Sequence, residues 1–98
     1  MSEILIVGDS VSVATARQLL ESTTWHTISV AMSPEEAAAK DRIRIDGNLQ
    51  GFDLIMAFGL ERRAFNQICH CRPDQLILTF PTVPEDVSKK VEEALSVP

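Results

Sequence analysis

The chain has 98 residues, of which 45% are hydrophobic and 23% are charged, and its formal net charge is −5. This length predicts one globular domain, residues 1–98, without room for a second catalytic unit. The acidic balance, with a pI near 4.9, argues against binding to nucleic acid, which requires a basic face, and against binding to an anionic membrane surface.

The first predicted elements are a strand and a helix. The run ILIV, at Ile4–Val7, does not alternate apolar with polar residues and is typical of a strand that is covered on both faces. A polar turn at positions 8–12 leads into a segment whose apolar residues recur at helical spacing. The run ISVA, at Ile28–Ala31, predicts the second strand.

The segment SPEEAAAK predicts the start of a second helix. Ser33 can cap this helix, Pro34 suits its first turn, and Glu36 completes a capping box. We predict that the following segment, DRIRIDGNLQGF at 41–52, is a connection with one short helical turn. Its RIRI alternates like an edge strand, whereas its glycines and Asn48 are typical of a loop.

The runs LIMAF (Leu54–Phe58) and LILTF (Leu76–Phe80) predict the third and fourth strands, each followed by an amphipathic helix. Strands and helices therefore alternate, which predicts a three-layer α/β/α fold around a parallel sheet. We predict the strand order 2-1-3-4. Ligands of such sheets bind beyond the carboxyl ends of the strands, where the order reverses, and the turn at 8–12 lies there.

This turn, Gly8, Asp9, Ser10, Val11 and Ser12, is the candidate ligand-binding site. A glycine turn before a helix N-terminus, with two hydroxyl donors, is typical of a site for phosphate or another small anion. However, the turn contains no Lys or Arg, the charge of Asp9 opposes an anion, and both glycine motifs of phosphate loops are absent. The structural alternative is that Gly8 turns the chain and Asp9, Ser10 or Ser12 caps the helix.

A second hypothesis makes Ser10 a nucleophile, because VGDS resembles the first block of the SGNH or GDSL hydrolases. That family supplies its base as D-x-x-H near the C-terminus, whereas here His70 follows QIC. The segment ILIVGDS is also similar to the start of receiver domains, ILIVDD. The third strand ends in Ala57, Phe58 and Gly59, however, so no Asp is present there to accept a phosphoryl group.

Most of the chain resembles the low-molecular-weight protein tyrosine phosphatase family. The segments that carry this resemblance are, in order, ILIV with its polar loop, ATARQLL, HTISVAMS, GFDLIMAFGLERRAF, LILTFPTVPED and VSKKVEEAL. The resemblance implies a parallel α/β fold. It also implies a catalytic loop of Cys, five residues and Arg after the first strand, and an acidic Asp after the fourth.

These catalytic residues are missing. Gly8 stands at the position of the family's Cys, the next arginine is Arg17 within the helix, and Pro81 and Thr82 stand at the position of the acid. Since glycine cannot replace a thiolate nucleophile, the resemblance implies a phosphatase-like domain without phosphatase chemistry. The IIB domains of the sugar phosphotransferase system are similar in length and core, but Gly8 again replaces their phosphoryl-accepting cysteine.

The segment CHCRP, Cys69–Pro73, contains three soft metal ligands. A closed zinc site normally takes four ligands from two separated pairs, so a helix end is the simpler interpretation, with Cys69 packed inward and Pro73 stopping the helix. We expect Cys69 and Cys71 to stay reduced, and we expect no metal and no cofactor.

Trp25 precedes the second strand, where a core or rim position is usual; if it is exposed, it is a strong candidate for a protein contact. Arg62 and Arg63 are predicted on the exposed side of a helix. They form either a solvated face or a basic patch that also includes Arg42, Arg44 and Arg72.

The leading functional prediction is a non-catalytic interaction or regulatory module that binds a protein partner or a second copy through Trp25 or Arg62 and Arg63. The first alternative is binding of a small ligand or anion at Gly8–Val13, and the second is a hydrolase that uses Ser10. Because no apolar run approaches ~18 residues and the N-terminus lacks a basic signal-peptide region, we expect a cytoplasmic protein.

Overall fold

The computed structural model describes residues 2–23, 25–47, 51–69 and 75–96. In chain order its elements are β1 (Glu3–Val7), α1 (Ser10–Thr23), β2 (Thr27–Ala31), α2 (Pro34–Asp46), β3 (Leu54–Phe58), α3 (Arg62–Cys69), β4 (Ile77–Phe80) and α4 (Val87–Leu95). The predicted alternation of strands and helices is confirmed.

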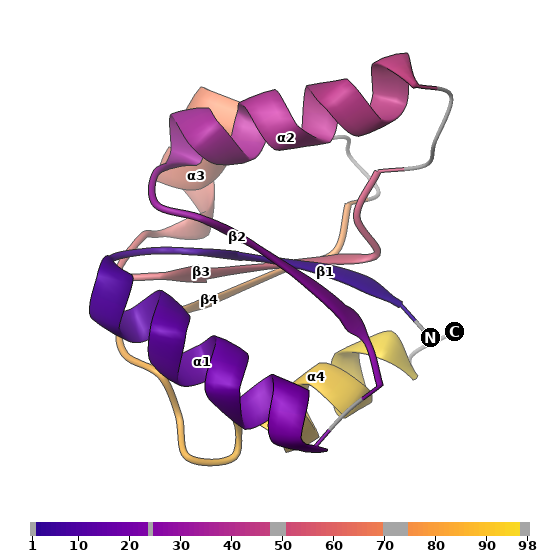
Figure 1. Ribbon diagram of the computed structural model, residues 1–98. Helices are drawn as coiled ribbons and strands as arrows, with labels where there is room; N and C mark the ends of the chain where they lie inside the picture. Colours follow the sequence, from indigo (N-terminus) through magenta and orange to yellow (C-terminus); the bar gives the residue numbers. More distant parts are fainter. Residues whose placement is uncertain (1, 24, 48–50, 70–74, 97–98) are drawn as a thin grey trace.

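The four strands form one parallel sheet in the order β2-β1-β3-β4, which confirms the predicted topology. Ile4 of β1 lies opposite Ile28 of β2 on one side and Leu54 of β3 on the other. Figure 1 shows α2 and α3 on one face of the sheet and α1 and α4 on the other, so the molecule has three layers.

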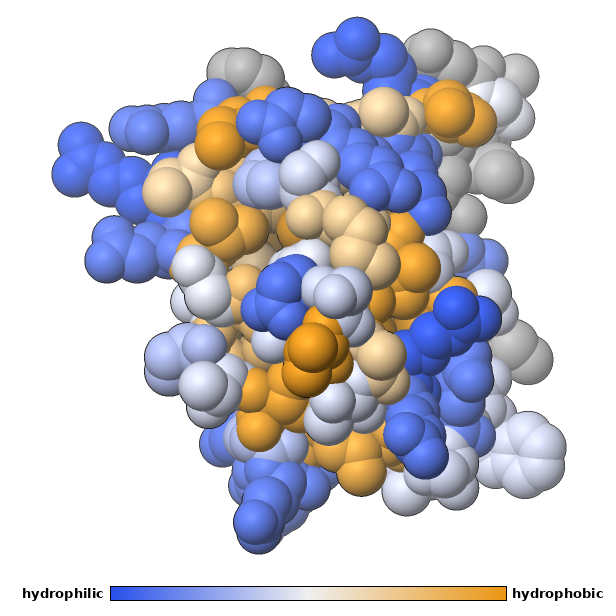
Figure 2. Space-filling view, turned by 60° about the vertical axis from the view of Figure 1, so that its left-hand side comes forward, coloured by the Kyte–Doolittle hydropathy of each residue, from blue (hydrophilic) through white to orange (hydrophobic). Residues whose placement is uncertain are grey.

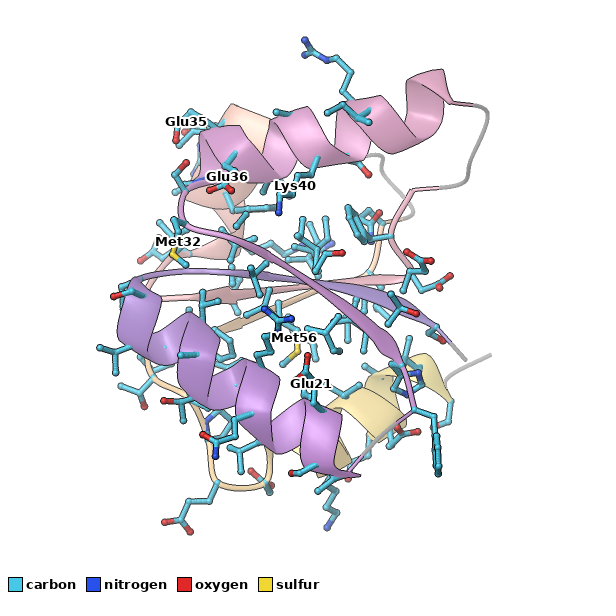
Figure 3. All side chains as sticks on the ribbon, viewed as in Figure 1. Glu21, Met32, Glu35, Glu36, Lys40 and Met56 are labelled. Atoms are coloured by element: carbon cyan, nitrogen blue, oxygen red, sulfur yellow. The ribbon has the colours of Figure 1, made fainter. Side chains whose placement is uncertain are left out.

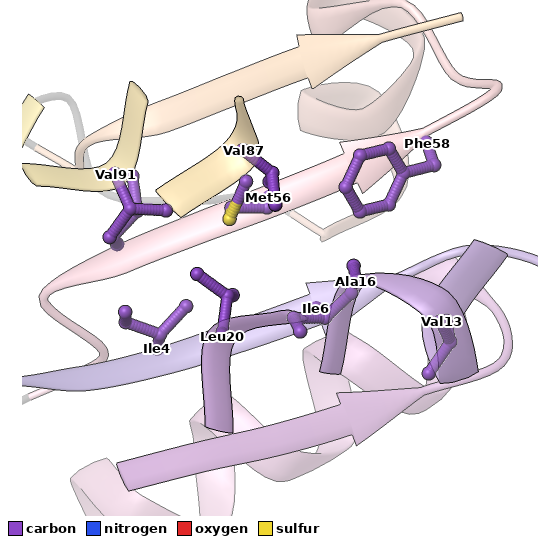
Figure 4. Close-up of a cluster of buried hydrophobic side chains, with 10 residues drawn as sticks. Ile4, Ile6, Val13, Ala16, Leu20, Met56, Phe58, Val87 and Val91 are labelled. Atoms are coloured by element: carbon purple, nitrogen blue, oxygen red, sulfur yellow. The ribbon is translucent and has the colours of Figure 1, made fainter. Parts of the chain in front are cut away.

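Each face of the sheet has its own hydrophobic core, because successive side chains of a strand point to opposite faces. On the side of α1 and α4, Ile4, Ile6 and Met56 pack against Leu20 and Val91 (Figure 4). On the side of α2 and α3, the buried residues include Leu5, Val7, Ile55, Ala57, Phe65 and Cys69. The central strands β1 and β3 are therefore buried on both faces, as their unbroken apolar runs predict.

The start of α2 is built as predicted. Ser33 Oγ accepts a hydrogen bond from the Glu36 backbone N–H at 3.1 Å, and Glu36 Oε2 accepts one from the Met32 backbone N–H at 2.8 Å. These bonds satisfy backbone donors that have no partner within the helix, so this residue pattern fixes where α2 begins.

The prediction for 41–52 is wrong over its first half, because α2 continues to Asp46 and RIRI is helical. Ile43 is 72% exposed, so the alternation in this segment does not mark a strand buried on one face. Once the first turn has formed, each added residue brings one more backbone hydrogen bond, and the helix extends. The Gly47 N–H donates to the Ile43 carbonyl at 3.1 Å, where glycine commonly ends a helix.

Candidate functional site

The candidate site lies where the strands end. The carboxyl ends of β1, β2 and β3 surround a crevice of about 310 Å³. Its lining residues are Val7, Gly8, Asp9, Met32, Ser33, Pro34, Phe58, Gly59 and Leu60. Figure 2 turns this side of the molecule forward and shows hydrophobic side chains between the hydrophilic ones of the two helical layers. The crevice thus occupies the predicted point, where the strand order reverses.

Gly8 lies at a close approach between two strands. A Cβ atom at this position would lie 3.3 Å from both the Cβ and the carbonyl oxygen of Phe58, in the neighbouring strand β3. The Gly8 N–H donates to the Ala31 carbonyl of β2 at 3.2 Å. The backbone of Gly8 does not have a positive φ, whereas that of Gly59, directly after β3, has a φ of 76°. A larger residue at Gly8 would therefore strain the packing of β1 against β3.

Asp9 caps α1. Its Oδ1 accepts a hydrogen bond from the Ser12 backbone N–H at 2.8 Å, and its Oδ2 accepts one from the Ser12 hydroxyl at 3.0 Å. The bond from the Ser12 backbone N–H, followed by that from the Ser12 hydroxyl, holds the pKa of Asp9 below its usual value of 3.8. Asp9 is therefore ionised at neutral pH, and it serves the structural role that the sequence offered as an alternative to anion binding.

Both helices that begin at the crevice already carry a carboxylate at their N-terminus. Asp9 occupies that position on α1, and Glu36 hydrogen-bonds the turn that starts α2. Each carboxylate satisfies a helix donor and offsets the positive end of the helix dipole. These two carboxylates therefore oppose the approach of an added phosphate to either helix N-terminus.

Of the other predicted turn residues, Ser10 is exposed and Ser12 is half-buried at the start of α1, and Val11 is 74% exposed. His26, the histidine that the structure describes, lies at the opposite end of the strands, just before the first residue of β2. There its Nδ1 accepts a hydrogen bond from the Ser2 N–H at 3.0 Å, and its Nε2 contacts Glu92 Oε1 at 2.8 Å. Because a five-residue strand spans about 13 Å, His26 cannot act as a base for Ser10.

The loop after β3 contributes to the site but was not predicted. Gly59 and Leu60 line the crevice and also line a second hollow of about 340 Å³, with Glu61, Thr79, Phe80 and Pro81. A glycine directly after a buried strand is the sequence signal that could have identified this loop, because such glycines often allow a positive φ.

The two predicted contact surfaces are exposed. Trp25 follows α1 and is 90% exposed, so the core position that is usual for such a residue is not found. Arg62 and Arg63 are exposed at the start of α3, where they line an open hollow with Asn66 and Gln67. Of the wider basic patch, Arg42 is exposed on α2, whereas Arg72 and the side chain of Arg44 lie outside the described residues.

Cys69 is buried at the end of α3, as predicted. The rest of the CHCRP segment, His70 to Pro73, lies outside the described residues. Within the described ranges, no group of three or more His, Cys, Asp or Glu side chains is placed to hold a metal ion. Nor does any helix in the described part of the chain have the length and hydropathy needed to cross a membrane.

No family model matches this chain, and no curated protein matches it. One solved structure is similar to it, a fusion that contains the yeast Spc42 trimeric coiled coil, amino acids 181–211, joined to another structure. The TM-score is 0.59 at 20% sequence identity, and the match covers 96% of this chain and 64% of the fusion. This likeness concerns the fold alone.

Proposed function

We propose that this chain is a non-catalytic, phosphatase-like domain that acts as a protein-interaction or regulatory module. The observation that carries the proposal is Trp25, an indole that is 90% exposed on a chain whose other large aromatic side chains lie in or beside the core. Exposing so large an apolar surface to water is unfavourable, and tryptophan is enriched among the residues that dominate binding energy.

The crevice supports the non-catalytic part of the proposal. Gly8 stands where the resembled phosphatases have their cysteine, and a Cβ atom there would lie 3.3 Å from the Cβ and the carbonyl oxygen of Phe58. Asp9 is engaged in capping α1, and Cys69 is buried at the end of α3, on another element. Neither cysteine nor arginine from the described residues lines the crevice.

A second candidate function is binding of a small ligand in the crevice. Its apolar walls, from Val7, Met32 and Phe58, and its place at the reversal of strand order favour this function. The carboxylates of Asp9 and Glu36 favour an uncharged ligand over the anion considered from the sequence. For the third candidate, a hydrolase that uses Ser10, the described histidine, His26, contacts Glu92 and lies out of reach of the Ser10 hydroxyl.

The interaction proposal can be tested through the fluorescence of Trp25, because the chain has one Trp and no Tyr. Proteins captured by the immobilised chain from an extract of its source are purified and titrated into it. We expect a saturable shift of the emission to shorter wavelength, as the indole leaves water, and we expect Trp25→Ala to abolish capture. Ile43→Ala, which removes another exposed apolar side chain, is the matched control and should bind normally.

Binding with unaltered affinity to both Trp25→Ala and the Arg62→Glu/Arg63→Glu variant would show that the contact lies on another surface. Turnover of an aryl phosphate by the purified chain would show that the domain is catalytic.

A further inference from the structure

The two outer strands of the sheet, β2 and β4, differ in whether another part of the chain contacts their outward backbone groups. The Thr27 N–H donates to Ser2 and the Ala31 carbonyl accepts from Gly8, so the backbone groups of Ile28 and Val30 point away from β1. The Lys40 ammonium donates to the outward carbonyl of Val30, and Figure 3 shows Lys40 reaching from α2 toward β2. A side chain from the neighbouring helix α2 thus occupies an outward acceptor of this outer strand, and covering an edge in this way opposes pairing with another chain, so the edge of β2 is protected.

The edge of β4 has no such protection among the described residues. The Leu76 carbonyl accepts from the Ile55 N–H at 3.0 Å, and the Phe80 carbonyl accepts from the Gly59 N–H at 2.8 Å. These bonds turn residues 76, 78 and 80 toward β3 and leave the N–H and carbonyl groups of Ile77 and Thr79 pointing outward. These outward groups form a ready template for another strand.

An apolar row runs beside this edge. The side chains of Leu78 and Phe80 lie on the face of α1 and α4, and the Phe80 ring stacks on Phe58 with the centroids 5.8 Å apart. Leu76, two residues before Leu78, is 37% exposed. Between β4 and α4 lies a groove of about 330 Å³, lined by Leu78, Phe80, Lys90, Glu93 and Ala94.

We propose that β4 pairs with β4 of a second copy of this chain, in antiparallel orientation about a two-fold axis at Leu78. In that register Ile77 of each copy lies opposite Thr79 of the other, and each pair exchanges two backbone hydrogen bonds. Leu78 then faces the second copy's Leu78, and Phe80 faces Leu76. Every position of the apolar row meets an apolar partner, which is the self-complementarity that a two-fold interface requires.

The charges beside the groove favour a second copy over an unrelated strand. The two-fold axis makes the two copies of α4 antiparallel. Lys90 of each copy therefore faces Glu93 of the other copy across the interface. Unlike charges thus meet on both sides of the axis, and the attraction occurs twice. Among the described residues, the side chain of Lys90 has one distant ionic partner, Asp86 at 3.9 Å, and it lines the groove.

This interface is separate from the surface of the proposed function. Trp25 adjoins His26, which contacts Glu92 on the side of α4 that faces α1, and the Thr23 and Ser88 hydroxyls also join these two helices there. The groove lies on the other side of α4, so the dimer leaves Trp25 accessible. The β4 dimer and the protein contact through Trp25 can therefore be refuted independently of each other.

Sedimentation equilibrium of the whole chain between micromolar and millimolar concentration tests the dimer. We expect a concentration-dependent mass between that of the 10.8 kDa chain and twice that value. Thr79→Pro removes an outward donor that the monomer does not use, and should raise the dimer dissociation constant at least ~100-fold. Lys90→Glu should weaken the dimer about tenfold, because both symmetric attractions become repulsions. Lys89→Glu changes the net charge equally outside the groove and should leave the dimer intact.

The exchange Lys90→Glu/Glu93→Lys should restore the dimer, since it reverses both charges of each pair. If Thr79→Pro fails to fold by circular dichroism, hydrogen exchange of the wild type replaces it, and the Ile77 and Thr79 amides should be protected as concentration rises. A chain that stays monomeric at millimolar concentration would overturn the proposal. So would a dimer that survives Thr79→Pro, or one that Trp25→Ala abolishes while Lys90→Glu does not weaken it.

Discussion

Replacing Gly8 tests directly how the end of β1 is packed. In Gly8→Ala the new methyl group would lie 3.3 Å from two atoms of Phe58, a residue that is 2% exposed in the core. Overpacking of this kind costs about 1–3 kcal/mol. Alanine also restricts the unfolded chain, which returns about 0.4–1 kcal/mol. The expected net loss is therefore about 1–2 kcal/mol of unfolding free energy, and Gly8→Val should lose more.

For a domain of this size, such a loss lowers the melting temperature by about 5–15 °C, which thermal unfolding followed by circular dichroism resolves easily. Gly59 provides the matched control, because a Cβ there meets nothing within 4 Å and any cost comes from its φ of 76°. Asparagine tolerates that φ better than alanine, so Gly59→Asn should be milder than Gly59→Ala. At Gly8, where only the size of the new side chain matters, Gly8→Asn should instead be more destabilising than Gly8→Ala. A Gly8→Ala chain at least as stable as the wild type would refute this account.

Three further results are expected at the crevice. Millimolar phosphate should not raise the melting temperature, whereas a bound anion at one hundred times its dissociation constant would add ~2.7 kcal/mol; a rise that Gly8→Val abolishes would establish an anion site. The Ser12 hydrogen bonds lower the pKa of Asp9, so its carboxylate stabilises the fold above pH 3.8, and that contribution is lost as the pH falls through the lowered pKa. The stability gap between wild type and Asp9→Ala, measured with urea, should narrow in acid; a gap that widens would contradict this role. Wild type and Gly8→Cys should both fail to hydrolyse aryl phosphates, since Arg17 lies within α1; activity lost in Cys69→Ser would overturn the expectation.

The strands and the sheet order could be predicted because their signals are local and redundant. LIMAF matches β3, Leu54–Phe58, residue for residue, and the other three strands differ from their predicted bounds by one residue. An unbroken apolar run marks a strand buried on both faces, and right-handed crossovers leave few possible orders. A cap in the turn also follows from the sequence, which offered Asp9, Ser10 or Ser12 for it, and the structure shows that Asp9 fills the role.

What could not be predicted depends on longer-range contacts. RIRI has the alternation of a strand, but the helix that starts at Pro34 continues through it, and sequence periodicity does not show which of two local preferences prevails. The exposure of Trp25 is a property of the connection between α1 and β2, where there is no periodic face to predict it. The close approach at Gly8 comes from Phe58, fifty residues away in the sequence.

The central place of β1 has a consequence for the synthesis of the chain. Ile4 pairs with Ile28 and with Leu54, so β1, the earliest of the four strands in the chain, has a second neighbour that is synthesised fifty residues later. At about 5–20 residues per second, a ribosome takes about 3–10 s to add those residues. During that time β1 and β2 can pair only as a two-stranded ribbon, which is marginal in water. The run ILIV is therefore exposed to chaperones and to neighbouring nascent chains until β3 emerges, and its release from that state is tied to translation speed between α2 and β3.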